Sequence, residues 1–329
     1  MQNKKVSILF NKLTENPTID ELDVIEQVET IEKALKELGY ESIRIPFSFN
    51  IDAVVSELKR IAPIFAVNLV EAIDNDGQLI CFGPSILDYL KIPYTGCTKE
   101  AIFITSNKVL TKKIMAAQGV KTPEWVTLEP DSDNTFIDGE RYILKAIWED
   151  ASICLEADSV VKPESIEHLR ELIQNQNNRY KKEFFAERYI HGRDLSTSVL
   201  AGKSLSTREF IFSEAEDEVR VVGYKAKWDE DSEEFKNSDV TSEFAPEDKD
   251  LVAKTLVLSE DLWKKLNLNG YARVDFRVDD NREIYVLEVN ANPCISPDTA
   301  FVRALDASGI TFTQAMKQII DDMKIIYTK

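Results

Sequence analysis

One segment, YARVDFRVDDNREIYVLEVNAN at 271–292, constrains the fold more than any other part of the sequence. Apolar and polar residues alternate on both sides of a short polar run, which predicts two antiparallel strands joined by a tight turn. We place the turn at Asn281 and Arg282, so that Asp280 lies opposite Glu283. The register predicts three apolar pairs on one face: Val274 with Val289, Phe276 with Leu287, and Val278 with Tyr285.

The other face of the predicted hairpin is polar. The same register puts Asp275 opposite Glu288 and Arg273 opposite Asn290. Two carboxylates at about 5 Å repel each other and raise each other's pKa unless a cation lies between them. Mg²⁺ binds one or two carboxylates together with phosphate oxygens. We therefore predict that Asp275, Glu288 and Asn290 bind a divalent ion near phosphate. The alternative is a pair of ordinary arginine–carboxylate contacts on a solvated sheet face.

The remaining sequence predicts more than one domain, since 329 residues exceed one ordinary hydrophobic core. Residues 1–97 form the first predicted domain, in which three strands alternate with helices and build a parallel sheet. Its first helix has a capping box at Thr18 and Glu21 and stops at Gly39. The three strands are KKVSILF, ESIRIPF and PIFAVNLVE.

Two further domains are predicted at 98–190 and 191–329. The central one has a helix around NKVLTKKIMAAQG and the strands RYILKAIW and FFAERYI. The C-terminal one has the strands DLSTSVLAG, SLSTREFIF and EVRVVGYKAKW, the hairpin, and helices near LVAKTLVLSEDLWKKL and FTQAMKQIIDDMKII. Its acidic segment near 228–246 has few apolar residues, which predicts a mobile loop. The predicted fold class is α/β of the mixed α+β kind.

Charge and composition exclude several classes of protein. Forty basic and 58 acidic side chains give a net charge of -18, which disfavours nucleic-acid binding. Two histidines and four widely spaced cysteines indicate no histidine or thiolate metal site. No apolar run approaches the roughly 20 residues of a membrane-spanning helix, and the start of the chain has no cleavage-site pattern. We expect a cytoplasmic protein that binds neither nucleic acid nor membrane.

The hairpin motifs RVDF and EVNANP resemble the metal-binding end of the ATP-grasp superfamily, and specifically its D-alanine:D-alanine ligase branch. The resemblance covers nearly the whole chain, because TSNKVLTKK, YILKA, EDASICL and AERYIHGRDLS follow in the family's order. It implies a three-domain ATP-grasp architecture with the nucleotide between the central and C-terminal domains. It also implies ATP and two Mg²⁺ ions, replaceable by Mn²⁺, as cofactors, and is compatible with a homodimer.

The resemblance also implies roles for individual residues. The residues implied to bind ATP are Lys108, Lys145 and Lys227 at the phosphates, Glu187 and the backbone at Ile190 at adenine, and Asp194 at ribose. Ser152 would cover the γ-phosphate, and Arg273 would stabilise an oxyanion, so that Arg273, Lys227 and Ser152 form the implied catalytic set.

The implied activity is that of an ATP-dependent carboxylate–amine ligase, which forms an amide or peptide bond through an acyl phosphate. The substrate motifs depart from the family pattern. Cys294 replaces a glycine of the acceptor turn, Thr299 lies near the usual serine, and Asp20 occupies the place of a glutamate. We therefore expect an amino acid or short peptide other than two D-alanines as substrate. The alternatives are a D-alanine:D-alanine ligase and, less favoured, a non-catalytic ATP-binding module.

Overall fold

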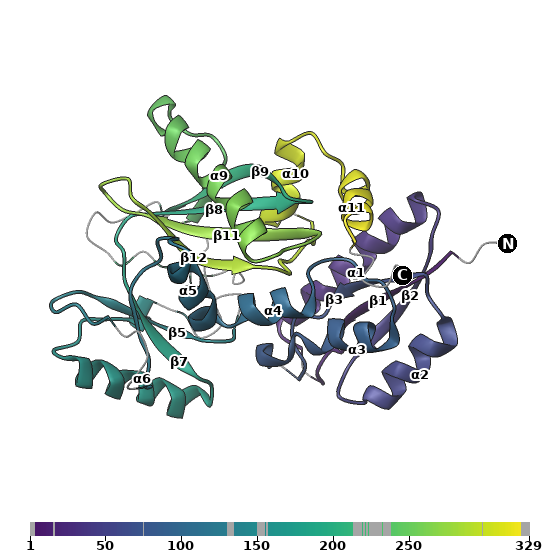
Figure 1. Cartoon of the computed structure of the whole chain (residues 1–329), viewed down its shortest axis with the longest axis horizontal. Helices are drawn as coiled ribbons and strands as arrows, with labels where there is room; N and C mark the ends of the chain where they lie inside the picture. Colours follow the sequence, from purple (N-terminus) through teal and green to yellow (C-terminus); the bar gives the residue numbers. More distant parts are fainter. Residues whose placement is uncertain are drawn as a thin grey trace.

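The computed structural model describes residues 4–15, 17–74, 76–129, 135–149, 155, 157–212, 219, 221, 223, 232, 238–297 and 299–323, with backbone only at 19, 20 and 157. The described strands form three separate sheets of three, four and five strands, which follow one another along the chain (Figure 1). The mixed α/β class that the sequence predicts is therefore confirmed.

The N-terminal sheet is parallel, with the strand order β2-β1-β3. Its strands are β1 (Lys5–Asn11), β2 (Glu41–Phe47) and β3 (Phe65–Leu69), and its helices are α1 (Ile19–Glu37), α2 (Ile51–Ile61) and α3 (Phe82–Leu90), with the short 3₁₀ helix η1 (Gly77–Leu79). The predicted capping box of α1 is present, and Gly39 follows the helix with a φ of 84°. Helices α1 and α2 belong to different apolar clusters, because successive residues of β1 point to opposite faces.

The central sheet is antiparallel, with the order β4-β7-β5-β6. Its strands are β4 (Trp125–Val126), β5 (Tyr142–Ala146), β6 (Val160–Val161) and β7 (Phe184–Arg188), and the 3₁₀ helix η2 (Ala157–Ser159) precedes β6. Helix α6 (Ile166–Tyr180) packs on one face, where Ile173 joins a cluster with Leu144 and Ala186. Since strand residues alternate, Lys145 and Glu187 lie on the other face of this sheet.

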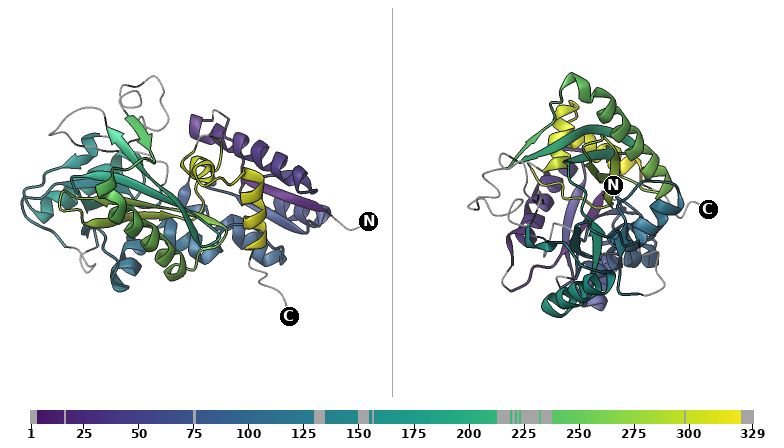
Figure 2. Two further views of the ribbon diagram at one scale, coloured as in Figure 1. Left: turned by 90° about the horizontal axis from the view of Figure 1, so that it is seen from above. Right: turned by 90° about the vertical axis from the view of Figure 1, so that its left-hand side faces the viewer.

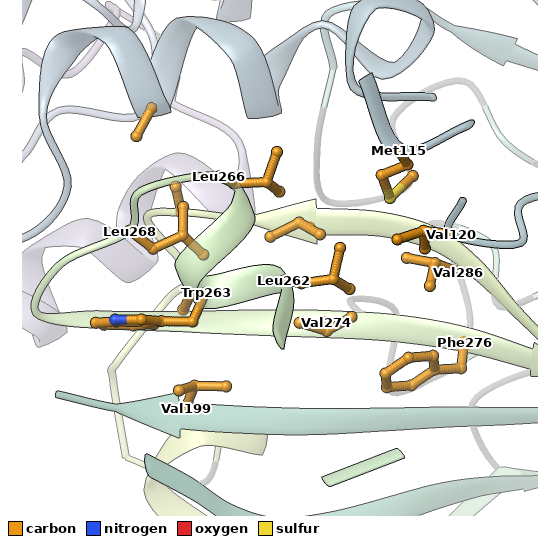
Figure 3. Close-up of a cluster of buried hydrophobic side chains, with 14 of the residues drawn as sticks. Met115, Val120, Val199, Leu262, Trp263, Leu266, Leu268, Val274, Phe276 and Val286 are labelled. Atoms are coloured by element: carbon orange, nitrogen blue, oxygen red, sulfur yellow. The ribbon is translucent and has the colours of Figure 1, made fainter. Parts of the chain in front are cut away.

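The C-terminal sheet is antiparallel, with the order β10-β9-β8-β11-β12. Its strands are β8 (Arg193–Leu200), β9 (Lys203–Phe212), β10 (Ser238–Thr241), β11 (Tyr271–Val278) and β12 (Ile284–Asn290). The 3₁₀ helix η3 (Pro246–Asp248) leads into α9 (Lys249–Lys265), whose Leu262 and Trp263 pack against the apolar face of the sheet (Figure 3). Most of the predicted strand EVRVVGYKAKW, at 218–228, lies outside the described residues, as do residues 228–231 and 233–237 of the predicted loop. The predicted loop extends too far, because its residues 238–241 form β10.

Two helices between the first two sheets pack against the third sheet. They are α4 (Lys99–Ser106), which the sequence pattern did not reveal, and α5 (Lys108–Ala117). Ile102 of α4 and Met115 of α5 share a buried cluster with Phe276 and Val289. Figure 3 shows Met115 and Phe276 in this cluster. Helix α5 therefore lies against the C-terminal sheet although the predicted boundaries assign it to the central domain. Those boundaries remain a prediction.

The hairpin of β11 and β12 confirms half of the predicted register. Arg273 pairs with Asn290 and Asp275 with Glu288, as predicted. Beyond Asp275 a β-bulge at Leu287 shifts the register by one residue. The predicted pairs of Phe276 with Leu287 and Val278 with Tyr285 are therefore wrong; the observed pairs are Phe276 with Val286 and Val278 with Ile284.

The last two helices return to the N-terminal unit. Helices α10 (Ala300–Ala307) and α11 (Phe312–Asp321) contribute Phe301 and Met316 to one apolar cluster with Val28 of α1. In Figures 1 and 2, α11 accordingly lies between α1 and the C-terminal sheet. No helix in the described part of the chain is long and apolar enough to cross a membrane.

Candidate active site

The polar face of the hairpin carries the predicted carboxylate pair. Two nitrogens of the Arg273 guanidinium, Nε and Nη2, donate to Asp275, each at 2.8 Å from a different carboxylate oxygen. Arg273 Nη2 also lies 4.0 Å from Glu288 Oε1. Since the two carboxylates face each other across neighbouring strands, the guanidinium offsets part of their mutual repulsion.

Helix α5 supplies the second cation of this patch. Lys108 is the first residue of the helix, 8% exposed, and its Nζ lies 3.3 Å from Glu288 Oε2. The same ammonium donates to the backbone carbonyl of Glu149 at 2.6 Å. Lys108 therefore links the hairpin to the chain segment that follows β5.

One turn further along α5, Lys112 forms an ion pair with Glu187 of the central sheet. Lys145 of β5 holds the other oxygen of the same carboxylate, with 2.7 Å between Nζ and Oε1. Burial alone would raise the pKa of Glu187, but Lys112 and Lys145 outweigh it and hold that pKa below its ordinary value. The three side chains form a buried charged cluster in which Glu187 stays ionised.

Lys112 is thus a site residue that sequence reasoning missed. It is only 1% exposed, and its Nζ also donates to Thr122 Oγ1 at 2.6 Å. The available signal was its spacing, because residues four apart lie on one side of a helix, next to the predicted Lys108. Through these two lysines α5 joins Glu288 of the C-terminal sheet to Glu187 of the central sheet.

The connection from β7 to β8 is held by a second missed residue, Arg277. Its Nε donates to the backbone carbonyl of Ile190 at 2.7 Å, and its Nη1 pairs with Asp194. Its Nη2 donates to Tyr189 Oη at 3.1 Å. Arg277 lies opposite Asp194 in the sheet, so strand pairing between β8 and β11 was the signal that could have revealed it. It therefore positions Ile190 and Asp194, two of the three residues that are predicted to contact adenine and ribose.

A cleft of about 660 Å³ opens beside this connection. Ile190, Arg141, Lys162 and Asp280 are among its lining residues, so both signs of charge are present. Of the described residues predicted to bind ATP, only Ile190 lines the cleft. The cleft and the lysine cluster are therefore separate features of the described structure.

The turn that follows β12 is tied to α1. Cys294 Sγ and Ser296 Oγ each donate to a different oxygen of Asp23, both at 2.7 Å. Burial, together with Glu71 and Asp23 nearby, raises the pKa of the Cys294 thiol well above its ordinary value, so that the thiol stays protonated and donates. Gln27 Oε1 accepts from the backbone of this turn at Ile295, at 3.2 Å.

Asp23 of α1 therefore meets the turn, and sequence reasoning did not name it. The side chain of Asp20 lies outside the described residues, as do Ser152 and Lys227. Thr299 precedes α10 and donates its hydroxyl to the Ser296 carbonyl at 2.8 Å. The structure thus brings Cys294 and Thr299 together in one turn.

The donor set on the hairpin fits a hard divalent cation. Asp275 and Glu288 present carboxylate oxygens from adjacent positions, and Asn290 presents an amide oxygen that accepts from the backbone of Asn292 at 2.8 Å. No group of three or more histidine, cysteine or acidic side chains suited to a metal occurs in the described residues. Two carboxylates leave room for phosphate oxygens, as Mg²⁺ prefers.

The three sheets, with lysines and paired carboxylates where the central and C-terminal ones approach, define an ATP-grasp protein. The family model described as "D-ala D-ala ligase C-terminus" matches residues 157–321, half of the chain. The chain belongs to this family, which confirms the resemblance seen in the sequence.

Individual relatives can be aligned with most of this chain. The D-alanine--D-alanine ligase of Aquifex aeolicus is 26% identical over 294 residues, 89% of this chain and 92% of the relative. That of Carboxydothermus hydrogenoformans is 28% identical over 305 residues, 89% of this chain and 90% of the relative. The solved D-alanine--D-alanine ligase of Bacillus anthracis in complex with ATP superposes with a TM-score of 0.73 at 20% identity, covering 98% of this chain and 97% of that one. This last similarity confirms the three-domain fold.

Proposed function

We propose that the protein is an ATP-dependent ligase that joins a carboxylate to an amine through an acyl phosphate. The observation that carries this proposal is the cross-strand pair of Asp275 and Glu288, flanked by Arg273 and Lys108. Such a patch can hold polyphosphate and offset the charge of a phosphoryl group in transfer.

The proposed reaction has two steps. A substrate carboxylate oxygen attacks the γ-phosphorus of ATP, the bond to the β–γ bridging oxygen breaks, and ADP leaves. The amine of the second substrate then attacks the acyl carbon, loses a proton, and displaces phosphate. No protein nucleophile takes part, so the side chains act by positioning and by electrostatics.

Individual residues have the following proposed roles. Lys108 pairs with Glu288 and Lys145 with Glu187 in the structure. When ATP binds, both lysines would exchange these carboxylates for phosphate oxygens. Arg273 would stabilise the oxyanion that forms when the amine attacks. Glu187, released by Lys145 but still paired with Lys112, would contact the adenine edge together with the backbone at Ile190. Asp194 would bind the ribose. Ser152 and Lys227 keep their implied phosphate roles as proposals.

Asp275, Glu288 and Asn290 would hold Mg²⁺, for which Mn²⁺ can substitute, and we propose two ions. The bound metal would withdraw charge from the phosphate oxygens during transfer. Until metal and ATP bind, Arg273 and Lys108 balance the carboxylates, which explains why a pair of acids tolerates this proximity.

The substrate is proposed to be an amino acid or short peptide other than two D-alanines. The support is the turn at Cys294. The thiol donates a hydrogen bond to Asp23, and the side chain adds bulk where the D-alanine:D-alanine ligase pattern has glycine. The proposed domain boundaries are 1–97, 98–190 and 191–329. The proposed compartment is the cytoplasm, and a homodimer is the proposed alternative to a monomer.

A second candidate, synthesis of D-alanyl-D-alanine itself, is favoured by the names of the relatives. A phosphate-release screen over D- and L-amino acids and dipeptides separates the two. We expect another substrate pair to exceed D-alanine in kcat/KM, and Cys294→Gly to raise the D-alanine rate. Efficient D-alanyl-D-alanine synthesis unmatched by any other pair would establish the second candidate, and no substrate-stimulated turnover at all would overturn ligase activity.

A further inference from the structure

The polar face of the C-terminal sheet continues beyond the carboxylate pair. Arg208 of β9 lies opposite Ser196 of β8, Ser196 opposite Asp275 of β11, and Asp275 opposite Glu288 of β12. Directly paired residues share a face, so these four side chains form one row across four strands. Arg208 lies two strand spacings, about 10 Å, from Asp275 and on the side away from Glu288.

Arg208 is a buried cation without a counterion among the described residues. It is 7% exposed, and neither a hydrogen bond nor an ion pair to its side chain occurs in the part of the chain that the structure describes. Burial, together with the nearby charge of Arg303, lowers the pKa of its guanidinium. A guanidinium nevertheless stays charged at neutral pH, and buried charges are normally paired. The position therefore calls for an anion.

Arg303 lies on α10, which packs across β9. Its side chain is exposed, whereas its neighbours Phe301 and Ala304 are buried in the apolar cluster. Helix α10 begins directly after the turn of Cys294 and Thr299. The two arginines thus flank the end of the site that adjoins this turn, in a protein whose net charge is -18.

The opposite end of the row, at Glu288, is the one proposed above to bind the phosphates of ATP. Lys108 contacts Glu288, and the lysine cluster of the central sheet lies beyond it on the same helix. An anion at Arg208 would be separated from that end by Asp275 and Ser196. It is therefore better matched to a substrate than to the nucleotide.

We infer that Arg208, assisted by Arg303, binds a carboxylate carried by the amine substrate, so that the second substrate is acidic. This inference rests on the ligase activity proposed above and specifies its substrate class. The carboxylate in question is additional to any group that the turn at Thr299 holds. A guanidinium can receive it through two parallel hydrogen bonds.

The test compares acidic compounds with their neutral amides in the phosphate-release assay: glutamate with glutamine and aspartate with asparagine, as both enantiomers, and dipeptides that contain them. We expect the acidic member to exceed its amide at least tenfold in kcat/KM. Arg208→Met should reduce that ratio to below about threefold, with KM for ATP and the rate with the amide preserved. Arg303→Gln should reduce it in the same direction by a smaller factor.

Arg208→Lys and Arg303→Gln keep the test decisive if Arg208→Met does not fold, because Lys retains the charge and Arg303 is exposed. Arg60→Met, at an exposed ion pair on α2, is the matched control and should leave the ratio unchanged. A wild-type enzyme that turns over amides as well as acids, or prefers phosphoserine to glutamate, would refute the carboxylate site. Equal loss with acid and amide would reduce Arg208 to a structural role. Absence of turnover with every compound would instead count against the proposed function.

Discussion

Glu288 is the residue at which the two parts of the candidate site meet. Its carboxylate lies 3.3 Å from the ammonium of Lys108 and 4.0 Å from the guanidinium of Arg273. It is also one of the two carboxylates proposed to hold Mg²⁺. A change of this side chain should therefore affect catalysis far more than folding.

We predict that Glu288→Gln lowers kcat at least 100-fold, because an amide is a poor ligand for a hard cation. The variant should keep the unfolding midpoint of the wild type within a few degrees. Steady-state kinetics over a Mg²⁺ titration measure the effect. Glu283→Gln, at the exposed end of the same hairpin, is the control and should retain full activity. Near-normal turnover of Glu288→Gln at saturating Mg²⁺ would show that the metal assignment is wrong.

Lys112 is expected to affect stability, in contrast to Glu288. It is buried, and replacing it by Met removes one of the two cations that hold the buried Glu187. Breaking a buried ion pair from one side costs about 3–5 kcal/mol, so Lys112→Met should lower the free energy of unfolding by that amount. Urea denaturation measures it, and Lys254→Met on the exposed side of α9 should change it by less than about 0.5 kcal/mol. A loss that small in Lys112→Met would mean that Lys145 alone satisfies Glu187.

At the scale of elements, the connection between β7 and β8 depends on a glycine. Gly192 has a φ of 142°, and a β-carbon at this position would meet the backbone carbonyl of Val278. Either the connection or the end of β11 must then move, and Arg277 holds Ile190 and Asp194 on both sides of the glycine.

We predict that Gly192→Ala lowers the free energy of unfolding by about 2–4 kcal/mol and weakens ATP binding. Calorimetric titration with a non-hydrolysable ATP analogue and urea denaturation measure the two effects. Gly119→Ala is the matched control, since Gly119 also has a positive φ, of 72°, but a β-carbon there would meet nothing within 4 Å. It should cost about 1–2 kcal/mol from backbone strain alone and leave ATP affinity unchanged. Equal effects in both variants would refute the steric argument.

Asp248, at the end of η3, joins two other elements. It pairs with Arg193 at the start of β8 and with Arg282 in the hairpin turn, each at 2.8 Å. Burial would raise the pKa of Asp248, but the two guanidinium groups outweigh it and lower that pKa. A carboxyl whose pKa is lower in the folded state stabilises the fold above its unfolded pKa, near 3.9, and this contribution is lost as the pH falls below that value.

We therefore predict that Asp248→Asn lowers the free energy of unfolding at pH 7 by about 1–3 kcal/mol and that the difference from wild type shrinks as the pH falls below about 4. Urea denaturation at a series of pH values measures this. Asp261→Asn, at an exposed pair on α9, should differ little from wild type at any pH. A difference that stays constant down to acidic pH would exclude the ion pairs as its cause.

Elements were predictable from the sequence where a local pattern determines them. The strand alternation, the capping box of α1 and the pairing of Asp275 with Glu288 all depend on neighbouring residues. The bulge at Leu287 was not predictable, because the alternation of apolar and polar residues in the hairpin is equally compatible with a regular register. With the bulge, Val286 joins the buried cluster that also contains residues of α5 and α9. The place of α5 against the C-terminal sheet was not predictable either, because it is set by long-range apolar contacts.

The site shows the same division. Its hairpin residues and the lysines Lys108 and Lys145 could be predicted from motifs. Lys112, in contrast, owes its place to a contact between α5 and the central sheet, and Arg277 owes its place to contacts with β8 and with the connection from β7. Asp23 was missed for a similar reason, since the turn that it meets is more than 270 residues away in the sequence. Side-chain identity alone does not distinguish such residues from solvated ones.

On the scale of the whole molecule, the N-terminal unit and the C-terminal helices share one apolar cluster. Met316 and Ile319 of α11 are buried with Val28 and Leu35 of α1. The N-terminal sheet therefore completes its core with residues from the other end of the chain. Its stability should be inseparable from that of the C-terminal part.

We predict a single unfolding transition, with coincident midpoints by tryptophan fluorescence and far-UV circular dichroism. All four tryptophans lie at 125–263, so fluorescence does not report on residues 1–97 directly, whereas circular dichroism does. Met316→Ala should lower stability by about 2–4 kcal/mol and shift both midpoints together. Lys317→Ala, exposed on the same helix, should shift neither. Two separated transitions in the wild type would mean that the N-terminal unit folds on its own.

The bulge at Leu287 also determines which face of the sheet each side chain of β12 occupies. Because of the one extra residue, Ile284 and Val286 lie on the apolar face, while Glu288 and Asn290, although separated from them by even numbers of residues, lie on the polar one. Deletion of Leu287 would restore ordinary alternation and turn either the carboxylate into the apolar core or the valine out of it. The number of residues between Val286 and Glu288 is therefore constrained more tightly than the identity of the side chains along the strand. A change in this number would disrupt either the apolar core or the carboxylate pair.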